Sequence, residues 1–372
     1  MNITDYNKIP TFDEALAIVE KEKGFSHSMQ EIHGKEVHSF KYNISYQGMW
    51  DDLSDGKINM RGLTFVDGNL VALPCPKFFN LGENEHTRSM EIADMQFATE
   101  KVDGSLISFF NVGDELEIKT MKSVYSDTAA EAREYLKERD DVVSFAKMCL
   151  NFKLSPMFEY VSDTDAGKIV IDYGKKDFVF LGARDLNTGR LYMDLHNFPI
   201  LIPDSVKPAR VFLSPEGVEV YNEQEGVEGV VLTLKSGLMV KVKTGWYCRL
   251  HKVLDTFNTK NILESIVNDN IDDVKASLAQ NGLDDHLRVI GNVERTFDMY
   301  YDRLLKKAKG KCQDCKLTNM TKKDIAMTLM KEDRVLASLV FALYDGKDIT
   351  ESIKKNIKEK LKDKELNSFC PF

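Results

Sequence analysis

The alternation of hydrophobic and polar positions changes character once along the chain, close to His251. Before that point an amphipathic helix is expected near 12–21, followed by strand-like alternation from about Val37 to about residue 250. After it, apolar residues recur every three or four positions, as in NILESIVNDNIDDVKASLAQ, which is typical of helices. We therefore predict an α+β fold with a mainly antiparallel domain at 1–254 and an all-helical domain at 255–372.

Two β-hairpins are expected within the first domain. LISFFNVGDELEIKT indicates two strands around a turn at 113–114, and GVVLTLKSGLMVKVKT indicates two more around a turn at 236–237. Between them, SDTAAEAREYLKERDDVVSFAKMCL has helical periodicity and a spacing from Thr128 to Glu131 that resembles a capping box. This stretch predicts one or two helices.

The helical domain contains two features with alternative interpretations. Ile353, Ile357 and Leu361 share one face of a predicted helix, and the lysines on the other face form either a solvated surface, which we favour, or an RNA-binding tail. Cys312 and Cys315 are spaced like half of a zinc site. Because no second pair of ligands follows at a suitable spacing, we interpret them as reduced thiols.

Composition limits the classes of function. Charged residues make up 29% and hydrophobic ones 43%, and the formal net charge is −9, so the chain resembles a globular protein and not one that coats nucleic acid. A local basic cleft is still allowed. The N-terminus has no apolar signal region, and the longest apolar stretch, Val335 to Tyr344, is shorter than a bilayer span. We expect a cytoplasmic protein without a membrane partner.

Lys101 is the first candidate for chemistry, because it stands just ahead of a strand-like run, in ATEKVDGSLISFF. An amine attacks only when it is deprotonated, so a reactive lysine needs desolvation or other positive charges nearby. The sequence offers further cations, which could form a polyanion pocket if they converge: Arg61, Lys77, Lys119, Lys122, Lys241 and Lys243. Phosphate is the obvious polyanion.

The last predicted hairpin indicates which of these cations share one face of a strand. Because successive side chains of a strand alternate between its two faces, Lys241 and Lys243 lie on the same face. The same pattern is also ordinary on a solvent-facing strand. Glu228, just before the partner strand, could offer a carboxylate to a divalent cation. Glu159 lies within an apolar run, where it is either a salt-bridged core residue or a ribose or metal contact.

The order of these motifs resembles a known superfamily. Lys101-Val102-Asp103-Gly104 is similar to the Lys-x-Asp/Asn-Gly motif of covalent nucleotidyltransferases, and it is followed in the family's order by Glu159, by EGVV at 228–231 and by Lys-x-Lys at 241–243. The segments MRGLTF, KFFNLGEN, FEYV and VKVKTGWYCRLH, and the helical C-terminal region, resemble the RNA ligase 1 family of T-even-type bacteriophages over nearly the whole chain.

The resemblance implies roles for individual residues. Lys101 would form a lysyl-AMP phosphoramide, Arg61 and Lys77 would bind the departing pyrophosphate, and Glu159 would hold the ribose. Glu228 would help to bind metal, while Lys241 and Lys243 would contact the α-phosphate. The remaining residues implied for the ATP site are Gly104, Tyr42 and Tyr247, with Phe79 either a needed aromatic or a core residue.

One position departs from the family's pattern. Relatives have a second lysine in a Lys-Ser-Lys-Gly-like segment after the nucleophile, whereas this chain has Met121 there, within Lys119-Thr120-Met121-Lys122. Either Lys119 or Lys122 could take over the role in ATP binding.

The resemblance also implies an activity, cofactors and partners. The implied activity is ATP-dependent joining of 5′-phosphate and 3′-hydroxyl RNA ends through lysyl-AMP and adenylated-RNA intermediates. The implied cofactors are ATP and Mg²⁺, for which Mn²⁺ could substitute. The implied substrate is tRNA cleaved in its anticodon loop, read by the helical domain, and the implied partner is an end-healing polynucleotide kinase/phosphatase in the cytoplasm of a phage-infected host. Three alternatives stay open: a DNA ligase, a capping guanylyltransferase and a non-catalytic RNA-binding scaffold. The first two families append an oligonucleotide-binding barrel where this chain has helical sequence.

Overall fold

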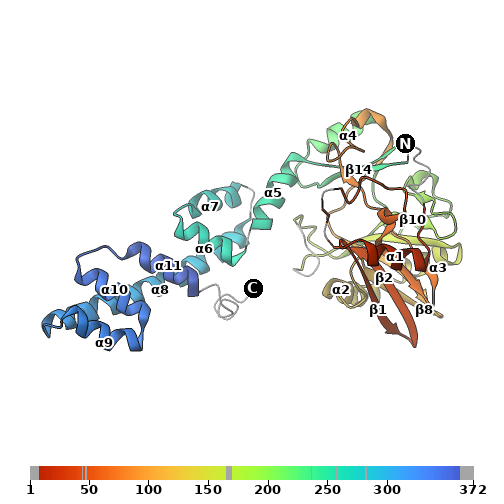
Figure 1. The fold of residues 1–372 in the computed structure, drawn as a ribbon. Coiled ribbons are helices and arrows are strands. Elements are labelled where there is room, and N and C mark those ends of the chain that lie inside the picture. Colours follow the sequence, from red (N-terminus) through yellow and green to blue (C-terminus); the bar gives the residue numbers. More distant parts are fainter. Residues whose placement is uncertain are drawn as a thin grey trace. The chain divides into compact units, whose positions relative to one another are not determined.

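The computed structural model describes residues 8–43, 45–46, 48–164, 170–235, 237–256, 258–280 and 283–360. It divides into two compact units, Met1–Cys248 and Arg249–Phe372 (Figure 1). Every strand in the described ranges belongs to the first unit, where the strands form three sheets. The second unit is helical throughout its described ranges. The α+β class predicted from the sequence is therefore confirmed.

The first sheet is a four-stranded antiparallel meander. Its strands are, in spatial order, β1 (Phe25–Ile32), β2 (Lys35–Tyr42), β3 (Arg61–Val66) and β4 (Asn69–Ala72). Helix α1 (Phe12–Lys21) packs on β1 and begins with a capping box in which Thr11 and Glu14 satisfy each other's backbone N–H groups. The short 3₁₀ helix η2 (Lys57–Asn59) leads directly into β3, so Arg61 stands at the start of that strand.

The second sheet has five antiparallel strands. Their order is β11 (Leu191–Tyr192), β10 (Asp177–Asp185), β9 (Leu154–Val161), β7 (Ser105–Val112) and β8 (Glu115–Thr120). The predicted hairpin at 113–114 joins β7 to β8, with Val112 opposite Glu115. Helices α2 (Asp127–Leu136) and α3 (Asp140–Asn151) pack against this sheet. They bury an aromatic face that includes Phe109, Phe158 and Phe178.

The third sheet sets the positions of the candidate site residues. Its order is β12 (Val211–Phe212), β6 (Met95–Glu100), β13 (Gly229–Leu234), β14 (Met239–Lys243) and β5 (Phe79–Asn80), and only the β14–β5 pair is parallel in this sheet as described. Helix α4 (Pro215–Asn222) packs on β12 and β13. Since β13 pairs with β6 on one side and with β14 on the other, the chain just after β6 and the end of β14 flank the start of β13.

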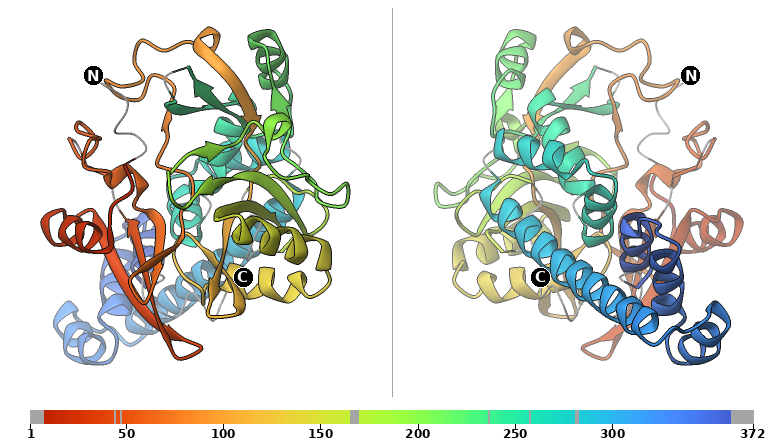
Figure 2. Two further views of the ribbon diagram at one scale, coloured as in Figure 1. Left: turned by 90° about the vertical axis from the view of Figure 1, so that its right-hand side faces the viewer. Right: turned by 90° about the vertical axis from the view of Figure 1, so that its left-hand side faces the viewer.

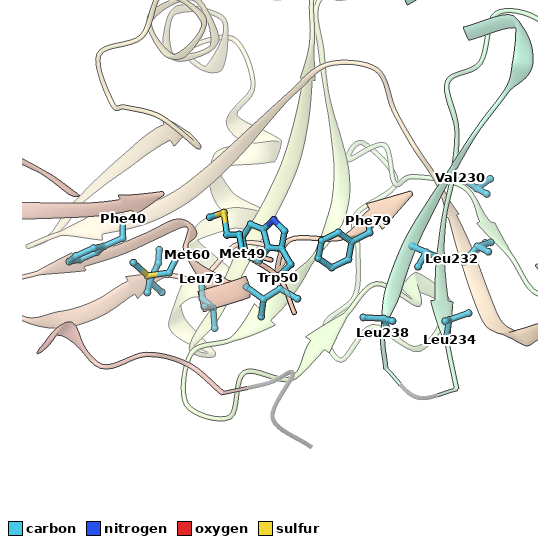
Figure 3. Close-up of a cluster of buried hydrophobic side chains, with 14 of the residues drawn as sticks. Phe40, Met49, Trp50, Met60, Leu73, Phe79, Val230, Leu232, Leu234 and Leu238 are labelled. Carbon is cyan, nitrogen blue, oxygen red and sulfur yellow. The ribbon is translucent and has the colours of Figure 1, made fainter. Parts of the chain in front are cut away.

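A continuous apolar core connects the first sheet to the third. Figure 3 shows it running from Phe40 on β2, past Trp50, to Phe79 on β5 and Leu232 on β13. Each of these side chains is less than a tenth exposed. The core fixes the two sheets relative to each other, so that the start of β3 and the end of β14 are held by the same packed side chains.

The helical unit is organised around one long helix, α8 (Asp284–Leu317), which Figure 2 shows with shorter helices along it. Helix α5 (Gly245–Thr256) spans the division between the units, and the remaining helices are α6 (Thr259–Val267), α7 (Ile271–Gln280), α9 (Lys322–Glu332), α10 (Arg334–Tyr344) and α11 (Thr350–Lys360). Ile353 and Ile357 of α11 are buried in the core of this unit, as are the free thiols of Cys312 and Cys315.

Some sequence predictions need correction or lie outside the described residues. Ser126, and not Thr128, caps α2, because its hydroxyl accepts from the N–H of Ala129. Glu131 instead accepts a hydrogen bond from the hydroxyl of Tyr160. Leu361 and Ser236 lie outside the described residues. Among the described helices, none combines the length and the apolar character that a membrane span requires.

Candidate active site

Lys101 follows the last residue of β6, at the edge of the third sheet. Its backbone N–H donates to the carbonyl of Gly229 at 2.9 Å, which continues the β6–β13 pairing by one residue. This places its side chain next to Glu228, the residue before β13. The Nζ of Lys101 lies 2.7 Å from Oε2 of Glu228.

Glu228 holds a second lysine as well. Its Oε1 lies 3.1 Å from Nζ of Lys243, at the end of β14. The Glu228 side chain is only 2% exposed, whereas those of Lys101 and Lys243 are 22% and 24% exposed. One buried carboxylate therefore aligns two half-buried amines, and its burial is made possible by this double pairing.

At two positions near Lys101, another part of the backbone approaches so closely that only glycine fits. Gly229 has φ +143°, and a Cβ there would lie 2.0 Å from the carbonyl oxygen of Val242. A Cβ on Gly104 would lie 2.4 Å from the carbonyl oxygen of Tyr160 on β9. The glycine of EGVV is thus explained by the pairing of β13 with β14 in the third sheet, and that of Lys-x-Asp-Gly by the approach to β9 in the second sheet.

Asp103, which sequence reasoning treated only as part of a motif, anchors the loop after Lys101. It is 2% exposed, and its Oδ1 accepts from the Tyr247 hydroxyl at 2.7 Å. Its Oδ2 accepts from the backbone N–H groups of Val170 and Ile171, at 2.8 and 2.7 Å. The Nζ of Lys243 lies 4.6 Å from the centre of the Tyr247 ring. Asp103 therefore links the loop after the nucleophile to Tyr247 on α5, whose ring lies beside Lys243 at the end of β14.

Further cations surround this arrangement. The pKa of Lys241 is lowered to about 8 because the amine is desolvated and lies near Lys77, Lys243 and Lys101. The Nζ of Lys77 lies 5.0 Å from the centre of the Phe79 ring and 5.5 Å from that of Tyr42. Two of the three aromatic residues predicted for the site, Tyr42 and Phe79, therefore surround Lys77.

A cavity of about 580 Å³ opens beside Lys101. Its lining combines residues of the first two sheets, the loop after β6 and the segment that leads into α2: Arg61, Lys101, Gly104, Ser105, Leu106, Thr120, Met121, Lys122, Ser126, Asp127, Thr128 and Glu159. This volume is within the range of small-molecule sites, which is typically about 300–1,000 Å³. Of the lining residues in this segment, Lys122 was predicted from the sequence, whereas Ser126, Asp127 and Thr128 were not, since polar side chains there are ordinary at the start of a helix.

Glu159 lines the cavity from β9. Burial raises the pKa of its carboxyl to about 8, against the opposing attraction of Lys101 and Arg61. No hydrogen bond or ion pair joins Glu159 to the other residues described in the structure. A carboxyl group in a cavity wall can accept a hydrogen bond from a ligand hydroxyl or, when protonated, donate one to it.

The structure separates the two lysines between which the sequence left a choice. Lys122 lines the cavity, whereas Lys119 is fully buried between the first two sheets. Its Nζ donates to Ser39 Oγ at 2.7 Å, to Thr64 Oγ1 at 2.8 Å and to the carbonyl of Gly62 at 3.4 Å. Burial lowers the pKa of Lys119 to about 7. Lys119 thus ties β8 to β2 and β3 and is not in the cavity lining.

A second cavity, of about 390 Å³, lies elsewhere in the first unit. It is lined by Glu100 and by side chains from residues 195–211, and neither Lys101 nor Glu159 is among them. We therefore place the candidate active site in the larger cavity.

Comparison with known proteins defines the family. A family model described as RNA ligase matches residues 59–247, which include every predicted site residue except Tyr42. The chain belongs to this RNA ligase family. A putative RNA ligase of Thermovibrio ammonificans is 28% identical over 234 residues, covering 60% of this chain and 61% of that protein. RNA ligase 1 of bacteriophage TS2126 is 25% identical over 255 residues, covering 64% of this chain and 62% of that one. The chain thus spans about three fifths of the length of each relative.

Solved structures give more distant likenesses. A putative ATP-dependent DNA ligase from Aquifex aeolicus has a TM-score of 0.45 at 16% identity, covering 80% of this chain and 81% of that one. An archaeal ATP-dependent RNA ligase also has a TM-score of 0.45, at 14% identity, with 79% of each chain covered.

Proposed function

We propose that the protein is an ATP-dependent RNA ligase that carries AMP on Lys101. The observation that carries this proposal is the placement of the Lys101 amine: it lies in the wall of a ligand-sized cavity, next to Glu228 and among the cations Arg61, Lys241 and Lys243. Membership of the RNA ligase family supports it, as do relatives named as RNA ligases.

In the first step, the neutral amine of Lys101 attacks the α-phosphorus of ATP. The N–P bond forms, the bond to the β-phosphate bridging oxygen breaks, pyrophosphate leaves, and the amine loses a proton. Arg61, Lys77, Lys241 and Lys243 stabilise the negative charge that gathers on the phosphates. Glu228 orients the amine beforehand, and Glu159 contacts the ribose.

In the second step, a 5′-phosphate oxygen of RNA attacks the AMP phosphorus, and the Lys101 amine leaves and regains a proton. In the third, a 3′-hydroxyl attacks the activated 5′-phosphorus, a phosphodiester forms, and AMP leaves. The covalent intermediate divides one difficult substitution into easier ones.

A divalent cation, Mg²⁺ with Mn²⁺ as a substitute, fits this site only together with substrate phosphates. No group of three or more His, Cys, Asp or Glu side chains suited to a metal occurs in the described ranges, and both Glu228 oxygens already pair with lysines. Mg²⁺ is usually bound by one or two carboxylates plus phosphates, so Glu228 is the residue that would hold it. When bound, the cation would neutralise charge on the transferring phosphate.

The proposal extends to the biological substrate. We propose that cleaved tRNA is the substrate, that residues 255–372 read its shape, and that an end-healing polynucleotide kinase/phosphatase prepares its ends in the cytoplasm. The support is the resemblance of the sequence motifs to the RNA ligase 1 family of T-even-type bacteriophages, together with the 25% identity to RNA ligase 1 of bacteriophage TS2126 over 64% of this chain. Ligation of a tRNA cut in its anticodon loop should be faster than ligation of a linear single strand with the same ends, and equal rates would contradict this extension.

The activity itself is tested with α-labelled ATP. Purified protein and Mg²⁺ should give a labelled band on a denaturing gel, and 5′-phosphorylated single-stranded RNA should discharge the label and be joined. A labelled band discharged by nicked duplex DNA, and not by RNA, would instead indicate a DNA ligase. Absence of any label would indicate a non-catalytic scaffold.

A further inference from the structure

Tyr125 is an exposed aromatic residue beside the candidate active site. It is 64% exposed, although it lies in the short segment between β8 and α2 that forms one wall of the cavity. Residues on both sides of it line that cavity: Met121 and Lys122 before it, and Ser126 and Asp127 after it. The hydroxyl of Tyr125 makes no hydrogen bond to the residues that the structure describes.

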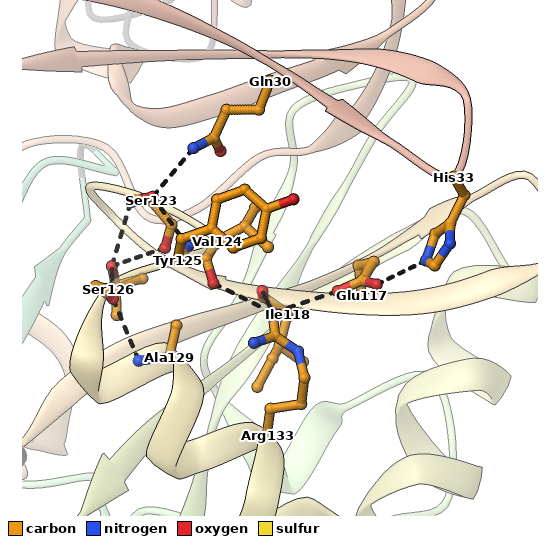
Figure 4. Close-up of polar contacts among 11 residues, drawn as sticks. Gln30, His33, Glu117, Ile118, Ser123, Val124, Tyr125, Ser126, Ala129 and Arg133 are labelled. Atoms are coloured by element: carbon orange, nitrogen blue, oxygen red, sulfur yellow. Dashed lines mark hydrogen bonds and ion pairs between the residues drawn. The ribbon is translucent and has the colours of Figure 1, made fainter.

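The segment that carries Tyr125 is held firmly on both sides. Figure 4 shows Ser123 and Ser126 within a network of hydrogen bonds that surrounds the tyrosine. The N–H of Tyr125 donates to Ser123 Oγ at 3.0 Å, and Ser126 Oγ lies 3.1 Å from Thr120 Oγ1. The carbonyl of Val124, whose side chain is 1% exposed, accepts from the Arg133 guanidinium at 3.2 Å. The ring is therefore presented to solvent by a fixed backbone.

Fixed, exposed aromatic rings are the usual platform for unpaired bases. A base has an apolar face that stacks on Tyr without any sequence requirement, and removal of such a ring by alanine substitution typically costs about 1–3 kcal/mol per base. Lys122 supplies a cation next to this platform, lines the cavity itself, and forms no ion pair with other described residues. A base on Tyr125 and a phosphate near Lys122 belong together in one terminal nucleotide.

We propose that Tyr125 stacks on the base of the 5′-terminal nucleotide of the RNA, whose phosphate enters the cavity past Lys122. This inference rests on the proposed function. The 5′ end is favoured over the 3′ end because only it carries a terminal phosphate to match the Lys122 amine, and that phosphate must reach the AMP on Lys101. Tyr125 is a binding residue for RNA and takes no part in adenylation of Lys101.

The test compares four full-length proteins: wild type, Tyr125→Ala, Tyr125→Phe and Phe152→Ala. Phe152 is a matched control, because it is also an aromatic of the first unit and is 66% exposed, but it follows α3 and lies outside the segment that lines the cavity. The probe is a fluorescent single-stranded RNA with a 5′-phosphate, titrated by anisotropy at fixed salt. Tyr125→Ala should raise the Kd by about fivefold or more. Tyr125→Phe and Phe152→Ala should stay within twofold of the wild type.

A second RNA identifies the base. With an abasic 5′-terminal nucleotide, wild type and Tyr125→Ala should bind equally, because the stacking partner is missing. The inference is overturned if Tyr125→Ala binds the intact RNA like the wild type, or if the difference disappears only with an abasic 3′ end. It is also overturned if Tyr125→Ala raises the KM for ATP in self-adenylation, since the stacked base is then adenine. Because binding is measured without chemistry, failure to form any lysyl-AMP would reject the proposed function separately.

Discussion

The Nζ of Lys101 lies 2.7 Å from Oε2 of Glu228, and the other oxygen of the same carboxylate lies 3.1 Å from Nζ of Lys243. Lys243 ends β14 and Lys101 directly follows β6, and both strands pair with β13, so the sheet itself sets the separation of the two lysines. Glu228 thus orients the nucleophile and a phosphate-binding cation together.

Glu228→Gln should slow adenylation of Lys101 by about 100-fold, because misplacement of a reacting group by about 1 Å costs a factor of this size. The amide keeps the shape of the side chain but removes the charge that aligns both amines. Single-turnover labelling with α-labelled ATP measures the effect. An unchanged rate would show that the pairing seen here does not position the amine.

Lys119→Met should alter how stability depends on pH. The pKa of Lys119 falls from 10.5 to about 7 in the folded protein. The folded state then binds fewer protons than the unfolded state between these values, so stability rises with pH across this window. Between pH 7 and 9 the wild type should gain about 2 kcal/mol in free energy of unfolding relative to Lys119→Met, as measured by urea titration.

Lys122→Ala is the control for that experiment. It removes a cation from the cavity wall, so we expect slower adenylation, by about tenfold, and no change in the pH dependence of unfolding. If the difference in stability between wild type and Lys119→Met were constant with pH, the buried amine would not titrate as the structure indicates.

Glu159→Gln should show the opposite dependence on pH. Burial raises the pKa of Glu159 from 4.5 to about 8, so the folded state binds more protons between these values and stability falls as pH rises through them. Linkage across this window amounts to about 3–4 kcal/mol, so at pH 8 the variant should melt roughly 10 °C above the wild type, and at pH 5 the two should be much closer. Differential scanning calorimetry of the ligand-free proteins measures both. The same difference at both pH values would contradict the raised pKa.

Gly104→Ala should destabilise the first unit by about 1–3 kcal/mol, because the new methyl group would overlap the backbone of β9. The matched control is Gly217→Ala, where the nearest atom to an added Cβ is at 3.6 Å. The free energy of unfolding from urea titration compares the two. Equal stability of both variants would mean that β9 does not approach Gly104 this closely.

The sequence predicted the α+β class and its local hairpins, because these depend on short-range alternation and turn residues. It could not predict that β6 pairs with β13, since residues 95–100 and 229–234 are far apart in the chain. That pairing, and not the motifs alone, brings Lys101 to Glu228.

The burial of Lys119 could not be predicted from the sequence either, for a different reason. Its alternation with Ile118 predicts one buried and one solvent-facing side chain. In the structure, Ile118 packs against α2 and α3, but the opposite face of β8 is covered by the first sheet, where Ser39 and Thr64 receive the amine. The alternation of apolar and polar residues along a strand cannot show that both of its faces are covered. The side chain that reaches the cavity, Lys122, lies just beyond the end of the strand.

The central claim is that the amine at position 101 becomes bonded to AMP, and peptide mapping tests it most directly. After incubation with ATP and Mg²⁺, mass spectrometry should find one AMP on the peptide that contains Lys101. Lys101→Ala should carry no AMP, yet should still join an RNA that is supplied with an adenylated 5′ end. An AMP adduct on another residue, or normal labelling of Lys101→Ala, would contradict the account.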